Sequence, residues 1–330
     1  MVRMLGAVVL CAAAALVPNA AAAQALSGQI WQPNKPIAIV IPFPPGPGLD
    51  LVARMVGDKL SASIGQPVVY ENRTGASGSI AAEYVARAVP DGTTLMAAAT
   101  STHATNVHLI KNLSYDPVKN FTPIVESVET IGCIVVNTSV VPVNSVAELV
   151  AYAKANPGKL NYASAGAGTS HHLAGELFKQ QTGTFITHIP YRGAGPALQD
   201  LIAGNVDCMF DGLGSSAQHI KAGRIKALMV AGKTRNAAFP DVPCAAEVGL
   251  PDYTVTTWYG LWTPKGTPAD VQAKIVEDVN KSMQADDIKS VWASNGSEIP
   301  TLTPAQFGAF VSSEVKRWAV VVKSAGAKLD

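Results

Sequence analysis

The stretch GTSHH at residues 168–172 places a serine beside two histidines, the residue types that a hydrolase uses for nucleophilic attack. The common G-x-S-x-G motif presents its serine on a sharp turn that needs the second glycine. His172 occupies the position of that glycine, and GLGSSAQ at 212–218 lacks it in the same way. The spacing therefore does not predict a nucleophilic hydrolase.

Two kinds of cofactor site are disfavoured by spacing as well. GPGLDL at 46–51 begins like a dinucleotide-binding loop, but Leu51 replaces the third glycine and Pro47 has no N–H for a pyrophosphate. HATNVH at 103–108 lacks the glutamate of a zinc-binding HExxH motif. The adjacent histidines at 171–172 would point about 100° apart on a helix. We expect no cofactor and no metal.

Corners between strands and helices, rich in glycine and hydroxyl residues, are the feature that remains. They are PFPPGPGLD at 42–50, ENRTGASGS at 71–79, YASAGAGTS at 162–170 and IPYRGAGPA at 189–197. Free backbone N–H groups at the start of a helix can hold an anion without a cluster of lysines. In a parallel α/β sheet such corners gather at one edge. The sequence therefore predicts a small-anion site built from several loops.

The elements that must position these corners follow from an alternation of short apolar runs and longer helical stretches. Strands are predicted at 36–42, 67–72, 93–100, 133–137, 160–165, 186–191, 206–211 and 225–232. Helices are predicted at 49–65, 78–90, 145–158, 170–183, 195–204 and 215–223, and over most of the chain after 268. This order is typical of an α/β fold with parallel sheets covered by helices.

Two crossings divide the chain into two predicted lobes. FTPIVE at 121–126 leads out of the first lobe, and TVTTWYGLW at 254–262 leads back. Residues 26–126 and 251–330 then form lobe 1, and 127–250 form lobe 2. Two α/β lobes joined by two crossings can move as a hinge, and the cleft between them is the expected ligand site.

Composition and the N-terminus predict an exported protein. The 330 residues include 25 basic and 24 acidic ones, without a basic run, so nucleic-acid binding is not expected. A basic start, a short apolar stretch and small residues predict a signal peptide, 1–25, cleaved near Ala23 or Ala25. After cleavage three cysteines remain, so at most one internal disulfide can form, and the sequence does not select its pair.

Segments throughout the chain resemble the solute receptors of tripartite tricarboxylate transporters, known as Bug receptors. The matching segments are PFPPGPGLDLVAR, VYENRTGASGSIAAEYVARAVPDGTTL, STHATN, YDPVKNFTPI, YASAGAGTSHHLAGELF, HIPYRGAGPALQDLIAGNVDCMFD, IKAGRIKAL and FPDVPCAAEVGLPDY. The resemblance implies a two-lobed periplasmic-binding-protein fold that closes on a small carboxylate-bearing solute. It also implies a monomeric receptor in the periplasm that delivers the solute to membrane permease subunits and performs no reaction.

By the same resemblance, the loop from Phe43 to Asp50 binds one carboxylate through backbone groups and ordered waters. Residues of the other corners would line the cleft, and Asp211 would contact an amino or hydroxyl group of the solute or order its own loop. The candidate ligand-binding residues are Phe43, Pro44, Gly46, Gly48, Asp50, Ser77, Ser101, Thr102, His103, Ala167, Thr169, Ser170, Tyr191, Arg192 and Asp211.

The first loop departs from the usual pattern of the family, which has two adjacent glycines before the helix. Here the order is Gly46-Pro47-Gly48, so one backbone donor is lost and the loop is stiffer. A carboxylate would be held more weakly, at a shifted place or through more water. We expect Asp50 to cap the following helix or to order a water, rather than to bind an anion.

The sequence alone does not decide which class of solute is bound. Small hydroxyl-rich corners suit a di- or tricarboxylate or an acidic amino acid, whereas Phe43, Tyr191 and Trp258 could stack on an aromatic acid. Two other functions remain as alternatives: a secreted α/β enzyme that acts on small organic acids, and a sensor that presents a solute to a signalling partner. An enzyme would need a pair of titratable groups with displaced pKa values, and the corners offer no obvious pair.

Overall fold

The computed structural model describes residues 31–327 and 329. The predicted signal peptide, 1–25, with its cleavage point near Ala23 or Ala25, lies outside the described residues. In the described part of the chain, no helix has both the length and the apolar character that crossing a membrane requires.

Strands and helices alternate along most of the chain, as the sequence predicts. The strands are β1 (Ile37–Ile41), β2 (Val68–Asn72), β3 (Thr94–Ala99), β4 (Phe121–Val136), β5 (Asn161–Ser164), β6 (Thr187–Pro190), β7 (Cys208–Gly212), β8 (Lys226–Val230), β9 (Thr256–Pro264) and β10 (Ser297–Glu298). The α-helices are α1 (Leu49–Ile64), α2 (Ser79–Ala86), α3 (Asn106–Leu109), α4 (Val146–Ala155), α5 (Ser170–Thr182), α6 (Ala194–Ala203), α7 (Leu213–Lys221), α8 (Ala269–Met283), α9 (Asp286–Ser294) and α10 (Pro304–Ala325). Three short helical turns are η2 (Ala76–Gly78), η3 (Ser101–Thr105) and η4 (Ala245–Val248).

The described strands form one mixed sheet in the order β2-β1-β3-β9-β4-β7-β5-β6, and β8 and β10 also pair with β4. The outer strands are parallel, β1 with β2 and β3, and β5 with β6 and β7. Every antiparallel pair involves β4 or β9. The α/β fold is therefore confirmed. Its centre is antiparallel because β4 carries the chain out and β9 brings it back.

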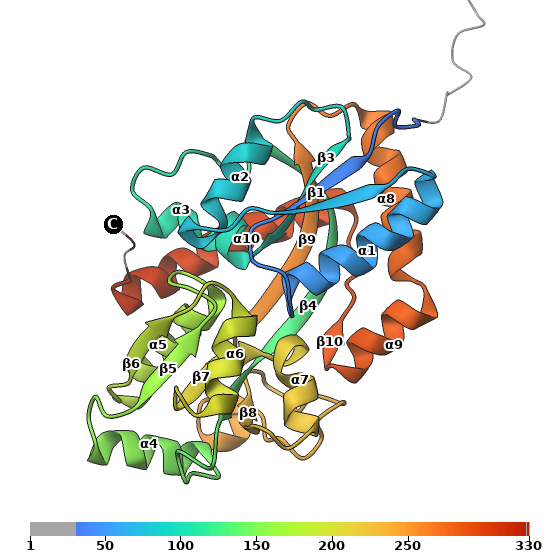
Figure 1. Ribbon diagram of the computed structural model, residues 1–330. Coiled ribbons are helices and arrows are strands. Elements are labelled where there is room, and N and C mark those ends of the chain that lie inside the picture. The colour runs from blue at the N-terminus through green and yellow to red at the C-terminus, as the bar shows by residue number, and fades with distance from the viewer. Residues whose placement is uncertain (1–30, 328, 330) are drawn as a thin grey trace, which may run out of the picture.

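The long strand β4 joins two halves of this sheet. It pairs with β9 from Phe121 to Ile131 and with β7 from Gly132 to Val136. We call β2, β1, β3 and β9 the first half, and β7, β8, β5 and β6 the second half (Figure 1). Each half includes the loops and helices that follow its strands. The first predicted crossing, 121–126, lies within β4, and the second, 254–262, overlaps β9 from residue 256 on, but β4 changes partners a few residues later than 126. The lobe boundaries at 126/127 and 250/251 remain a prediction.

Helices cover both faces of the sheet, and one of them contacts both halves. Val52 and Val56 of α1 share a buried cluster with Ile275 and Val279 of α8. The last helix, α10, contacts β4, η3 and α5, and Figure 1 shows it passing behind β9. The indole N–H groups of Trp258 in β9 and Trp318 in α10 both donate to Glu314 Oε2 at 3.0 Å. These contacts fix α10 against the strand that returns the chain to the first half.

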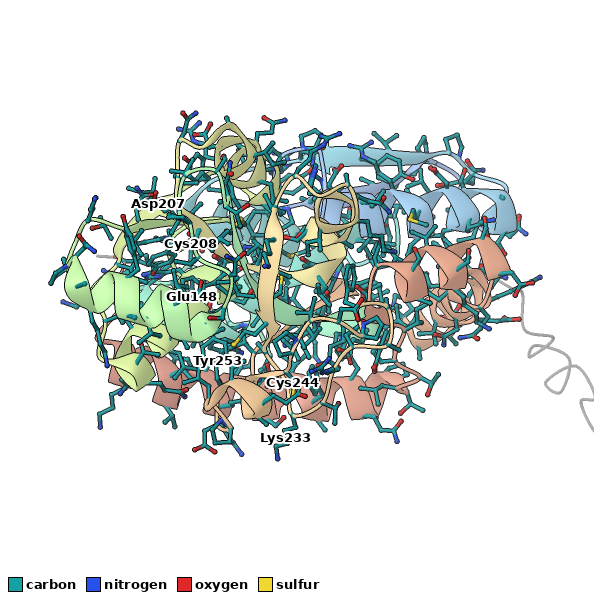
Figure 2. All side chains as sticks on the ribbon, turned by 90° about the horizontal axis from the view of Figure 1, so that it is seen from below. Glu148, Asp207, Cys208, Lys233, Cys244 and Tyr253 are labelled. Carbon is teal, nitrogen blue, oxygen red and sulfur yellow. The ribbon has the colours of Figure 1, made fainter. Side chains whose placement is uncertain are left out.

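The cysteines of the described residues, Cys133, Cys208 and Cys244, are buried free thiols. Figure 2 shows Cys208 and Cys244 well apart. Each donates to a backbone carbonyl close to its own strand or turn, Cys208 Sγ to Asn161 O at 3.4 Å and Cys244 Sγ to Lys233 O at 3.3 Å. The thiols therefore serve as small core residues.

A buried carboxyl group lies in the part of β4 that pairs with β9. Glu126 is paired with Gly260 of β9, is 2% exposed, and its Oε1 has no hydrogen-bond partner among the described residues. Burial, with the nearby carboxylates of Glu129 and Glu314, raises the pKa of Glu126 to about 8. Between about pH 4.5 and pH 8, Glu126 is therefore protonated in the folded protein and ionised in the unfolded chain.

We expect Glu126→Gln to flatten the fall in stability with rising pH. Because the folded pKa exceeds the ordinary value of 4.5, the stability that this group contributes at low pH is lost as the pH rises from about 4.5 through about 8. At pH 9 the variant should be more stable than wild type by at least about 1 kcal/mol. Urea unfolding at pH 6 and pH 9 measures this difference. The exposed Glu277→Gln on α8 is the control, and an equal pH slope in all three proteins would contradict the prediction.

Candidate functional site

Corners from both halves of the sheet enclose a small cavity of about 40 Å³, which we call the inner cavity. Its lining consists of Phe43–Leu49, Ala99–Ser101, Ala165, Thr169–His171, Gly193–Pro196, Thr257 and Tyr259. A wider opening of about 430 Å³, the outer groove, shares Phe43, Pro44 and Ala165 with it. The outer groove is completed by Pro42, Thr74–Gly78, Gly166, Ala167 and Pro190–Arg192.

Three helices begin at the inner cavity. The residues immediately before α1, α5 and α6 are Gly48, Thr169 and Gly193, and all three line it. A helix N-terminus carries unpaired N–H groups and about half a positive charge. No lysine or arginine belongs to the described lining of this cavity. Its attraction for an anion therefore comes from backbone dipoles and hydroxyl groups.

Asp50 holds the loop between β1 and α1 in place. It is 3% exposed, and its carboxylate accepts from Gly46 N at 3.0 Å, Arg54 Nε at 2.9 Å and Asn72 Nδ2 at 2.8 Å. Asn72 Nδ2 also donates to Phe43 O at 2.7 Å. Although burial alone would raise it, the hydrogen bonds from Arg54, Asn72 and Gly46 hold the pKa of Asp50 below its ordinary value. Asp50 orders the loop from behind and makes no side-chain cap on α1.

The corner before α5 is fixed by its own hydroxyl groups. Thr169 Oγ1 accepts from His172 N at 3.5 Å, as an N-cap, and donates to Gly166 O at 2.7 Å. Ser170 Oγ lies 2.6 Å from Thr257 Oγ1 of β9. The second half is thereby tied to the returning strand at the wall of the inner cavity.

The two halves touch around the cavity. Ser77 Oγ donates to Ala167 O, and Thr105 Oγ1 donates to Gly168 O at 2.7 Å. Gly193 has φ +120°, a backbone conformation that other residues rarely adopt, and a Cβ added there would lie only 3.1 Å from Pro44 Cγ, so glycine suits this close approach. The structure therefore has its corners closed against one another.

The structure divides the candidate residues into three groups. Those that line the inner cavity are Phe43, Pro44, Gly46, Gly48, Ser101, Thr169 and Ser170. The outer groove is lined by Ser77, Ala167, Tyr191 and Arg192, together with Phe43 and Pro44. Four residues line neither space: Asp50, Thr102, His103 and Asp211.

His103 and Thr102 lie behind the wall of the cavity, because residues 101–105 form the helical turn η3. His103 is fully buried, stacked on Trp262 at a centroid distance of 4.2 Å and set edge-on to Phe121 at 4.8 Å. Burial lowers its pKa to about 3, so the ring is neutral. Thr102 Oγ1 donates to Ala99 O at 3.0 Å. Both residues therefore pack the core beneath Ser101.

The aromatic side chains that could stack on a solute differ in access. Trp258 is fully buried against α10, which contradicts the expectation that it could face an aromatic acid. Tyr191 lines the outer groove and donates to Asp200 Oδ2 at 2.7 Å. Phe43 is half-buried and lines both spaces. Of the three, Phe43 is the one positioned at the inner cavity.

Several lining residues were not among the candidates, and three of them carry polar side chains that the corners did not point to: His171, Thr257 and Tyr259. The last two alternate along β9, so the period of two in a strand could have placed both on one face of the predicted crossing. His171 follows the N-cap Thr169 in the first turn of α5. Adjacent histidines on a helix point about 100° apart, which argues against a metal pair but gives no signal that the first of them reaches the cavity wall.

Arg192 is exposed at the outer groove and makes no hydrogen bond or ion pair with another described residue. If this guanidinium contacts a carboxylate of the solute, the contact should contribute about 1.5–3 kcal/mol. We then expect Arg192→Ala to weaken binding about ten- to a hundredfold without loss of thermal stability. Calorimetric titration measures this, with the exposed Arg87→Ala as control. Equal affinities in both variants and wild type would assign Arg192 to the surface.

Comparison with known proteins places the chain in a family. The model of the tripartite tricarboxylate transporter family receptor, TctC, matches residues 52–327. The periplasmic binding protein BugD has a similar structure, with a TM-score of 0.85 and 34% identity over 90% of this chain and 99% of that one.

Two solved structures from Rhodopseudomonas palustris contain ligands. MatC, with bound malate, has a TM-score of 0.84 and 33% identity, covering 88% of this chain and 99% of its own. A second protein, with adipate, has a TM-score of 0.84 and 35% identity, covering 90% of this chain and 99% of its own. The expected two-lobed periplasmic-binding-protein fold is thus confirmed, and the homologues are solute-binding receptors rather than enzymes. The chain belongs to the tripartite tricarboxylate transporter receptor family, which includes the Bug proteins.

Proposed function

We propose that this protein is an exported receptor that captures a small di- or tricarboxylate, or an acidic amino acid, in the inner cavity. The observation that carries the proposal is the convergence of three helix N-termini, those of α1, α5 and α6, on a cavity without a lysine or arginine in its described lining. Backbone N–H groups and hydroxyls bind carboxylates in such a setting. The malate and adipate held by two relatives support the same class of solute.

The arrangement of the cavity supports capture by closure. Its wall combines Gly46 and Ser101 from the first half with Thr169 and Gly193 from the second. A solute that contacts both halves stabilises the closed state over the open one, and this difference in affinity drives closure. We take the moving units to be the two predicted lobes, 26–126 with 251–330 and 127–250.

Pro47 would then limit the backbone donors that can bind one carboxylate. Pro47 lines the cavity and has no N–H, while the N–H of Gly46 is already used by Asp50. The carboxylate would therefore depend on the N-terminus of α1 and on bridging waters at this corner. The small volume of the cavity favours a compact acid over an aromatic one.

Delivery to a permease completes the proposal. The predicted signal peptide would send the protein to the periplasm, where it would work as a monomer and hand its solute to the membrane subunits of a tripartite tricarboxylate transporter. Transport reconstituted in vesicles with these subunits should require the receptor. Uptake at the same rate without it would overturn this part.

The receptor function is tested by binding and by recovery of the solute. Succinate, malate, adipate, citrate, aspartate and benzoate would be screened by thermal shift and measured by calorimetry. A solute at a hundred times its Kd adds about 2.7 kcal/mol of stability, which raises the Tm by a few degrees. Small-angle scattering should show compaction, and mass spectrometry should recover the solute unchanged. Steady conversion in proportion to protein concentration, or no binding by any acid, would overturn the proposal.

A further inference from the structure

A histidine with one unpaired nitrogen lies in the wall of the inner cavity. His171 is 6% exposed and lines the cavity from the first turn of α5. Its Nε2 lies 3.4 Å from Asp211 Oδ1, while its buried Nδ1 has no hydrogen-bond partner among the described residues. Buried polar atoms in proteins are nearly always paired, so an unpaired nitrogen beside a cavity indicates a missing partner.

Asp211 fixes the orientation and the proton of this ring. It is 2% exposed and lies at the end of β7, where its carboxylate accepts from Ser215 Oγ at 2.8 Å and from Ser216 Oγ. A carboxylate next to Nε2 favours the tautomer with the proton on that nitrogen. Burial, although opposed by Asp211, lowers the pKa of His171, so the ring is neutral near pH 7. Its Nδ1 then carries a lone pair and can only accept.

We propose that His171, oriented by Asp211, recognises the substituent on carbon 2 of the solute. Nδ1 would accept a hydrogen bond from the hydroxyl of a 2-hydroxy diacid or from the ammonium of a 2-amino diacid, while the helix N-termini hold the carboxylates. The cavity would thereby select malate-like and aspartate-like acids over unsubstituted diacids such as succinate. This inference rests on the proposed receptor function and names the solute class within it.

The inference is tested with L- and D-malate, L- and D-aspartate and succinate. Wild type should bind one malate or one aspartate more tightly than succinate. His171→Leu should weaken malate about three- to tenfold and aspartate about ten- to a hundredfold more than it weakens succinate. His171→Asn, whose amide oxygen can take the place of Nδ1, should restore part of that preference. The control His219→Leu, on α7 outside both spaces, should change none of the ratios.

Asp211→Asn tests whether Asp211 acts by setting the ring proton of His171 rather than by contact with the solute. An amide can donate to Nε2 and so move the ring proton to Nδ1, which would then donate. Malate, whose hydroxyl can also accept, should keep part of its preference, whereas aspartate, whose ammonium cannot accept, should lose it. Melting curves of the solute-free variants confirm folding.

The outcomes distinguish this inference from the proposed function. If none of the acids binds wild type, the proposed function fails. If the acids bind but wild type shows no preference over succinate, or if His171→Leu leaves the ratios as in wild type, the inference on His171 fails and the receptor function stands. An equal loss of affinity for malate, aspartate and succinate in His171→Leu would also overturn the inference, since it would indicate a merely structural role for His171.

Discussion

Replacing Gly195 with leucine should reduce solute affinity at least about a hundredfold while the solute-free protein stays as stable as wild type. Gly195 lies in the first turn of α6, where an added Cβ would be 3.3 Å from Pro47 Cδ of the opposite corner. That contact is already tight, and the remaining carbons of leucine would extend toward Pro47 or into the inner cavity that Gly195 lines, which disfavours the closed state. If only about 1% of the solute-free protein can still adopt the closed state that binds the solute, the apparent affinity falls about a hundredfold. Leucine is also a better helix former than glycine.

Calorimetry with the best acid of the screen, together with small-angle scattering, measures this effect. Gln199→Leu, one turn further along α6 at an exposed position, is the matched control and should bind as wild type does. Wild-type affinity in Gly195→Leu would show that the contact between Gly195 and Pro47 plays no part in closure.

Asp50→Ala should lower the free energy of unfolding by about 3 kcal/mol and weaken solute binding as well. The substitution leaves Gly46 N and Asn72 Nδ2 short of an acceptor and removes the buried partner of Arg54. The Arg54 side chain is 38% exposed, so its charge can reach water and the cost stays at the lower end for a buried pair. The loop from Phe43 to Gly48 then loses its anchor beside the cavity.

Urea unfolding at pH 7 and pH 3 measures the effect, with the exposed Asp252→Ala as control. Because the folded pKa of Asp50 is below 3.8, its stabilisation is present above that pH and disappears as the pH falls through the folded value. The difference between Asp50→Ala and wild type should therefore shrink in acid. A variant as stable as wild type at pH 7 would refute the anchoring role.

Local sequence pattern determined much of this architecture. The apolar run at 36–42 became β1, the helical stretch at 49–65 became α1, and glycine-rich corners did begin α1, α5 and α6. These features depend on backbone preference and periodicity within a few residues, so they can be recognised without the rest of the chain. The family resemblance, carried by many short segments in order, was confirmed by the family model that matches residues 52–327.

Tertiary packing decided which side chains reach the solute space. Ser101 and His103 are two residues apart in one turn, yet the first lines the inner cavity and the second is stacked on Trp262, more than 150 residues later in the sequence. Likewise His171 reaches the wall and takes Asp211 as its neighbour only because α5 and β7 pack together. Sequence alone determined the fold class and the corners that could bind an anion. Which residues of those corners line the cavity depends on burial against distant strands, an interaction that no local pattern encodes.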